Sequence, residues 1–196
     1  MFPLFWILLL ITLLYLYSLT MRISENFESN SKYDNQYRLS DNILENTKEG
    51  SKPYYVVSGL TGQSSQPGQI ILTPDKGAHT GAGTVTLTIA ASSAGTPASA
   101  HFDMNGISGT ISYAKRKKGY ITIAFNGASN QSPIYFDRTE GAAGGAGGAN
   151  NSVGTVRYRN SDIGSVTSST ISLISHNEAL KLLPYILCGI LVANRR

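Results

Sequence analysis

The chain has 196 residues and carries 16 Lys and Arg against 12 Asp and Glu, which gives a formal net charge of +4 at pH 7. This modest excess of positive charge argues against nucleic acid as the partner. Cys188 is the only cysteine, so an intrachain disulfide is excluded and nothing indicates an oxidising compartment.

Residues 1–21 contain no charged side chain, and positions 4–19 are almost wholly Leu, Ile and aromatic residues. A bilayer core of about 30 Å needs about 20 helical residues, which this segment supplies. A cleaved signal peptide would begin with basic residues and end in a small-residue cleavage site, and neither is found here. We therefore expect an uncleaved transmembrane anchor. Its lipid-facing residues are expected to include Leu4, Phe5, Trp6, Leu10, Leu14 and Tyr17.

The basic residues nearest to this segment all follow it, at Arg22, Lys32 and Arg38. Because basic residues are retained on the cytoplasmic side of a membrane, the body of the protein is expected there. Glycosylation triplets beginning at Asn130 and Asn150 would argue for the opposite side. The topology and the state of these two asparagines therefore stay open.

Residues 22–52 are rich in Ser, Asn, Asp, Glu and Lys and have few aliphatic residues. Such a composition is typical of a segment that does not bury apolar surface, and it predicts a polar flexible tether. A coil of about 30 residues spans roughly 30 Å, which would hold a domain at some distance from a bilayer.

Residues 53–175 consist of short β-branched and aromatic runs separated by Gly, Ser, Asn and Pro, which predicts one antiparallel β-sandwich or jelly-roll-like domain. The runs alternate: Ile121, Ile123 and Phe125 share one face of a strand, and Val156 and Tyr158 share another. Two Ala- and Gly-rich stretches, 90–100 and 141–151, are expected to be exposed connections. The predicted strands are 54–58, 69–73, 84–90, 109–114, 120–126, 133–137, 154–159 and 167–174.

Four consecutive basic residues, Lys115, Arg116, Lys117 and Lys118, lie between two predicted strands and indicate a hairpin tip. One interpretation is a solvated turn that discourages edge-to-edge aggregation. The other is a contact site for an acidic protein surface or for anionic lipid headgroups.

Residues 176–196 predict a short apolar helix with a basic end at Arg195 and Arg196. The apolar run of 182–193 is about 10–14 residues, shorter than a membrane span normally requires. Three interpretations stay open: packing on a partner or on the protein's own sheet, lying on the membrane, or a short second span. The expected contact residues are Leu183, Ile186, Leu187 and Leu191.

Few residues indicate catalysis. His101 and Asp103, with the later His176, match the pattern by which jelly-roll oxygenases bind Fe(II) through two imidazoles and one carboxylate. The pattern is short, and no basic residue is suitably placed for a co-substrate carboxylate. We therefore interpret these histidines as surface or helix-capping residues and expect a non-enzymatic protein without a catalytic, cofactor or metal site.

The apolar segment 2–19, the polar tether and Gly/Thr/Ser-rich strands such as 83–90 resemble in layout the membrane-anchored minor capsid proteins of large icosahedral DNA viruses that enclose an internal membrane. The resemblance implies a virion structural protein at the interface between membrane and capsid. Its partners would be membrane lipid and other capsid or membrane proteins in a large assembly. The alternative is a membrane-anchored binding module, such as an adhesin or envelope protein, displayed on a cell or envelope surface.

Overall fold

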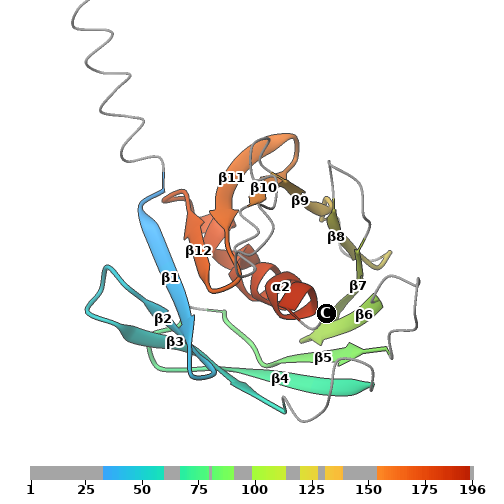
Figure 1. Ribbon diagram of the computed structural model, residues 1–196, viewed down its shortest axis with the longest axis horizontal. Coiled ribbons are helices and arrows are strands. Elements are labelled where there is room, and N and C mark those ends of the chain that lie inside the picture. Colours follow the sequence, from blue (N-terminus) through green and yellow to red (C-terminus); the bar gives the residue numbers. More distant parts are fainter. Residues whose placement is uncertain are drawn as a thin grey trace, which may run out of the picture.

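The computed structural model describes residues 33–59, 67–79, 81–90, 99–113, 120–127, 131–138 and 154–194. These residues form twelve antiparallel strands that close into a barrel, and a C-terminal helix, α2 (Asn177–Asn194), that lies inside it (Figure 1). Each strand pairs with the next along the chain, and β1 pairs with β12 to close the ring. The strands are β1 (Asn35–Ser40), β2 (Ile43–Asn46), β3 (Lys52–Ser58), β4 (Gly68–Pro74), β5 (Val85–Ile89), β6 (Ser99–Met104), β7 (Ile107–Tyr113), β8 (Ile121–Phe125), β9 (Ile134–Arg138), β10 (Gly154–Tyr158), β11 (Ser161–Val166) and β12 (Thr170–Leu173).

The predicted β-sandwich or jelly roll is wrong. A sandwich buries two sheets against each other, whereas here one sheet curls round and pairs its first strand with its last, Asn35 opposite Leu173 and Arg38 opposite Thr170. A barrel of about eight strands is just filled by its own side chains. A ring of twelve strands is wider, and α2 fills the remaining space.

Eight of the twelve strands coincide with predicted ranges, and β1, β2, β6 and β11 were not predicted. The tether predicted for residues 22–52 is wrong in its second half, because residues 35–46 form β1 and β2. These two strands look polar in the sequence, but Tyr37 and Leu44 face the core and are at most 1 % exposed. The β domain therefore begins before residue 53.

Several hairpins turn through two residues with positive φ. The pairs are Asp41 and Asn42 between β1 and β2, Asn105 and Gly106 between β6 and β7, and Arg159 and Asn160 between β10 and β11, with φ values of 47° to 82°. Two-residue turns of this kind match the right-handed twist of the strands they join, and Asn, Asp and Gly tolerate the left-handed backbone. Such short turns fix which residues face inward, because a shift of one residue would reverse every side chain.

The strand pairs define two ends of the barrel. At the N-terminal end lie Asn35, the β10–β11 turn and the first turn of α2, because Tyr158 pairs with Ser161 and Leu173 pairs with Asn35. At the C-terminal end lie the β7–β8 and β9–β10 connections and the last turn of α2. An 18-residue helix is about 27 Å long, which exceeds the roughly 17–23 Å of a five- to seven-residue strand, so α2 extends through the whole lumen.

Helix α2 is apolar around its full circumference, and every residue from Leu182 to Val192 is buried. A helix of this kind requires an apolar environment on all sides. Among the open interpretations of the tail, the structure shows packing against the protein's own sheet. In the part of the chain that the structure describes, no helix meets the length and hydropathy that a membrane span requires.

An aromatic cluster joins the helix to the barrel wall. The Tyr185 ring lies 5.1 Å from the ring of Phe102 on β6 and 5.0 Å from that of Phe125 on β8, between ring centroids. The Phe102 and Phe125 rings are 5.5 Å apart and meet at 78°. Edge-to-face pairs of this geometry add to the free energy that burial alone provides.

Both ends of α2 are held by side chains. The backbone N–H of Glu178 donates to Nδ1 of His176 at 3.3 Å, which caps the first turn. At the other end, Asn194 Nδ2 donates to the carbonyl oxygen of Ser168 in the β11–β12 turn at 2.7 Å. The predicted helix and the capping role of His176 are therefore confirmed.

Gly189 should not tolerate a side chain. A Cβ at this position would lie 2.8 Å from Cζ of Phe136 and 3.2 Å from Cδ1 of Ile123, both in the barrel wall. We expect Gly189→Ala to lower the free energy of unfolding by about 1–3 kcal/mol through overpacking, despite the better helix propensity of alanine. Gly127→Ala is the matched control, since nothing lies within 4 Å of a Cβ there. Urea unfolding of both variants tests this, and equal stability of the two would contradict it.

Candidate functional site

Ten of the residues predicted to make functional contacts lie outside the described residues. They comprise the six proposed anchor residues, Leu4, Phe5, Trp6, Leu10, Leu14 and Tyr17, and the four basic residues, Lys115, Arg116, Lys117 and Lys118. The strands that flank the basic residues do form a hairpin, since Tyr113 at the end of β7 pairs with Ile121 at the start of β8. Membrane and anion contacts by these residues remain predictions.

The predicted contact residues of the C-terminal segment lie in the lumen of the barrel. Leu183, Ile186 and Leu187 have no exposed surface, and Leu191 is 5 % exposed. They pack within the same core cluster as the inward-facing residues of the strands. In this arrangement they stabilise the fold and cannot also contact a partner.

The iron pattern is not assembled. His101 and Asp103 alternate along β6 with the buried residues Ala100, Phe102 and Met104, so both face the outside of the barrel. His176 lies at the start of α2 and caps that helix. Among the described residues, no group of three His, Cys, Asp or Glu side chains is close enough to bind a metal ion.

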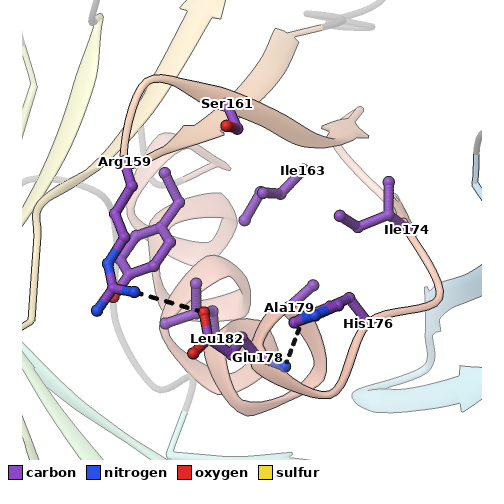
Figure 2. A pocket seen from close by; sticks show the side chains of 9 residues that line it. Arg159, Ser161, Ile163, Ile174, His176, Glu178, Ala179 and Leu182 are labelled. Atoms are coloured by element: carbon purple, nitrogen blue, oxygen red, sulfur yellow. Dashed lines mark hydrogen bonds and ion pairs between the residues drawn. The ribbon is translucent and has the colours of Figure 1, made fainter.

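The candidate site is a pocket beside the first turn of α2, at the N-terminal end of the barrel (Figure 2). Its volume is about 140 Å³. Ile163 of β11, Ile174 after β12, and Ala179 and Leu182 of α2 surround it, and Tyr158 of β10 forms another wall. We call this the Ile163 pocket. Its lining comes from two stretches of the sequence, 158–163 and 174–182, and no sequence pattern indicated it.

Charged groups form the rim of the Ile163 pocket. Arg159 Nη1 lies 3.6 Å from Oε2 of Glu178, and the Arg159 guanidinium lies 5.1 Å from the centroid of the Tyr158 ring. Arg159 follows β10 in a two-residue turn with φ of 49°, which directs it over this end of the barrel. Both partners of the ion pair are more than half exposed, so the pair contributes little stability and can rearrange.

A second cavity of about 330 Å³ lies on another side of the same helix start, lined by His79, Asn177, Leu180 and Lys181. The Nδ1 atom of His79 is buried without a hydrogen-bond partner. Burial, reinforced by the nearby positive charge of Lys181, lowers the pKa of His79. The imidazole is therefore uncharged at neutral pH, which leaves Lys181 as the charged side chain in the lining of this cavity.

The lumen contains several polar groups, but solvent does not reach them. The hydroxyls of Tyr55 and Tyr185 are buried and have no protein hydrogen-bond partner, and the buried hydroxyl of Tyr37 interacts with the neighbouring phenol of Tyr54. Burial is the main cause that raises the pKa of Tyr185 to about 12, with Cys188 contributing, and burial raises the pKa of the Cys188 thiol as well. A fully buried thiol whose pKa is raised is not a nucleophile at neutral pH. These groups form no accessible catalytic centre.

Comparisons of the chain with protein-family models, with curated proteins and with solved structures found no match. The functional argument therefore rests on the barrel, its two ends and the Ile163 pocket.

The buried phenols lead to a stability prediction. The fold raises the pKa values of these phenols and of the Cys188 thiol above their ordinary values, which are 10.0 for a phenol and 9.0 for the thiol. The stability that the protonated groups contribute is therefore complete below the ordinary pKa values. It is lost as the pH rises above those values, because the groups then ionise in the unfolded chain first. We expect the free energy of unfolding, measured in urea, to fall between pH 8.5 and 11. Tyr185→Phe should raise stability at pH 7 by about 1 kcal/mol, because it removes a hydroxyl without a partner.

Tyr135→Phe is the matched control for Tyr185→Phe, since Tyr135 lies on the outside of β9 and is 40 % exposed. We expect that substitution to leave stability within about 0.5 kcal/mol of the parent protein. A loss of stability in Tyr185→Phe larger than in the control would contradict the assignment of an unpaired hydroxyl.

Proposed function

We propose that this chain is a non-enzymatic structural protein, held to a membrane by residues 1–21, that connects the membrane to a protein layer. In its most specific form, it is a minor capsid component between an internal membrane and a capsid shell. The observation that carries the proposal is the filled lumen: α2 occupies the interior that a barrel of this width would otherwise offer to a ligand. The function therefore belongs to the outer surface and the two ends.

The direction of the chain supports a connector. The described chain begins at Tyr33 and joins β1 at the N-terminal end of the barrel, so the proposed anchor would attach at that end. The connection between β7 and β8, which contains the four basic residues, leaves and rejoins the barrel at the C-terminal end. A membrane attachment and a basic contact would then lie on opposite sides of a stiff body.

Two basic residues at the N-terminal end have acidic partners. Lys48 pairs with Asp34 at 3.8 Å, and Arg159 pairs with Glu178 at 3.6 Å. The β7–β8 connection, which leaves and rejoins the barrel at the C-terminal end, contains the basic residues 115–118. An excess of positive charge at one end favours an acidic partner surface at that end. This observation favours a protein layer over the anchoring membrane as the partner of the basic residues.

Membrane attachment can be tested in sealed vesicles from cells that express the full chain. We expect the protein to stay in the membrane pellet after an alkaline carbonate wash, and the barrel to be protected from protease added outside. The double substitution Leu10→Lys and Leu14→Lys should release the protein, because a charge at the centre of a membrane helix costs about 2.5–3.5 kcal/mol. Release of the parent protein by carbonate would overturn the proposal, whereas protease cleavage of a retained protein would favour surface display.

The basic contact can be tested by charge removal at each end. We expect Lys115→Gln, Arg116→Gln, Lys117→Gln and Lys118→Gln together to weaken binding of the purified full chain to immobilised poly-glutamate by roughly tenfold or more in 50 mM salt. The matched control removes four positive charges from the N-terminal end, with Gln at Lys48, Lys52, Lys76 and Lys181. An equal loss in both variants would mean that only the net charge matters and would contradict a directed contact.

A further inference from the structure

The Ile163 pocket has the size and lining of a site for one aromatic side chain. Its volume is about 140 Å³, and its walls include Ile163, Ile174, Ala179 and Leu182. A cavity of about 150 Å³ lined by aliphatic residues binds benzene in another protein, so a phenyl ring fits this volume. Ile163, Ala179 and Leu182 are each at most 6 % exposed, which means that the pocket is an indentation in the core rather than a loose surface groove.

The N-terminal part of the chain approaches the barrel beside this pocket. Asn35 pairs with Leu173, and its Nδ2 atom donates to the carbonyl oxygen of Ile174, a pocket residue, at 3.5 Å. Asp34 is also tied to this end through its ion pair with Lys48 at 3.8 Å. The described part of the chain therefore enters the barrel next to the pocket.

One residue in the preceding segment matches the pocket. Between Met21 and Tyr33, Phe27 is the only aromatic residue. Tyr33 is six positions after Phe27, and six steps of extended chain reach at most about 20 Å, which is enough to bring a ring to the pocket mouth. Glu28 follows Phe27 directly, and Arg159 lies on the pocket rim in an exposed ion pair that can rearrange.

We propose that the Phe27 side chain docks in the Ile163 pocket of the same chain, with Glu28 against Arg159. Closing a short loop costs little entropy, because the cost grows only with the logarithm of loop length. The high effective concentration of a ring linked so closely makes the same chain a better occupant than a free ligand or a second copy. The contact is small, so it opens and closes reversibly rather than permanently fixing the segment.

Docking would change how far the barrel lies from the membrane, and this consequence alone rests on the proposed membrane attachment. With Phe27 docked, five residues, 22–26, separate the anchor from the fixed part of the chain. With Phe27 free, the spacer extends to position 32.

The full chain in detergent micelles, with 4-fluorophenylalanine at position 27, tests the docking without a membrane and hence without the proposed function. We expect the fluorine signal to differ from that of a free peptide of residues 22–32. Ala179→Leu, which fills the pocket, should move the signal to the free-peptide value. A signal that already has the free-peptide value in the parent protein would overturn the proposal, as would one that does not respond to Ala179→Leu.

A second measurement does not depend on filling the pocket. In methyl spectra of the full chain, Phe27→Ala should shift the Ile163 and Ile174 methyl signals, because the ring current of the docked phenyl is lost. Ile23→Ala, in the same segment, is the matched control and should leave both signals unchanged. Unchanged signals in Phe27→Ala would overturn the proposal, and a docked signal that disappears on dilution would show that a second copy, not the same chain, supplies the ring.

Discussion

The fold depends on one condition: the lumen of a twelve-stranded barrel must be filled. Inward side chains alone fill a barrel of about eight strands, and a wider ring with apolar inward residues would leave a cavity lined by them. An α-helix about 10 Å across, apolar on every side, occupies the remaining space as α2. Helix α2 therefore completes the core, and without it the inward faces of the strands would lack their packing partner.

The fit between helix and wall is made by small residues next to large ones. Gly189 of α2 lies against Phe136 of β9, and Gly109 of β7 leaves room for the ring of Phe102. The same close packing encloses the hydroxyls of Tyr55 and Tyr185 without partners, which opposes folding. Large apolar burial outweighs that cost, but only while the helix stays in register with the wall. The side chains of the barrel wall thus restrict which residues α2 can carry, and those of α2 restrict the wall in the same way.

Most strands of the barrel could be predicted from the alternation of apolar and polar residues, but the closure of the sheet into a barrel could not. The runs that became β8 and β10 alternate clearly, and their inward residues Ile121, Ile123, Val156 and Tyr158 are buried as expected. β1 and β2 were not predicted, because their outward residues are polar and they have few inward residues. The Asp41–Asn42 pair, which favours a tight turn, could have indicated this hairpin. Pairing between β1 and β12 joins residues about 135 positions apart, and no local pattern encodes it. The Ile163 pocket was unpredictable for the same reason, since it combines β11, the end of β12 and α2.

A barrel that contains its own helix differs in functional capacity from one with an open interior. The large apolar concavity, usually the first candidate for a ligand, is used for stability, so recognition moves to the ends and the outer face. The two ends are unequal: the chain from the apolar N-terminal segment arrives at one, and the connection with four consecutive basic residues emerges from the other. Under the connector function proposed above, a body that is rigid between two attachments would transmit position rather than chemistry. The Ile163 pocket, of one-ring size, lies at the end where the described chain enters β1.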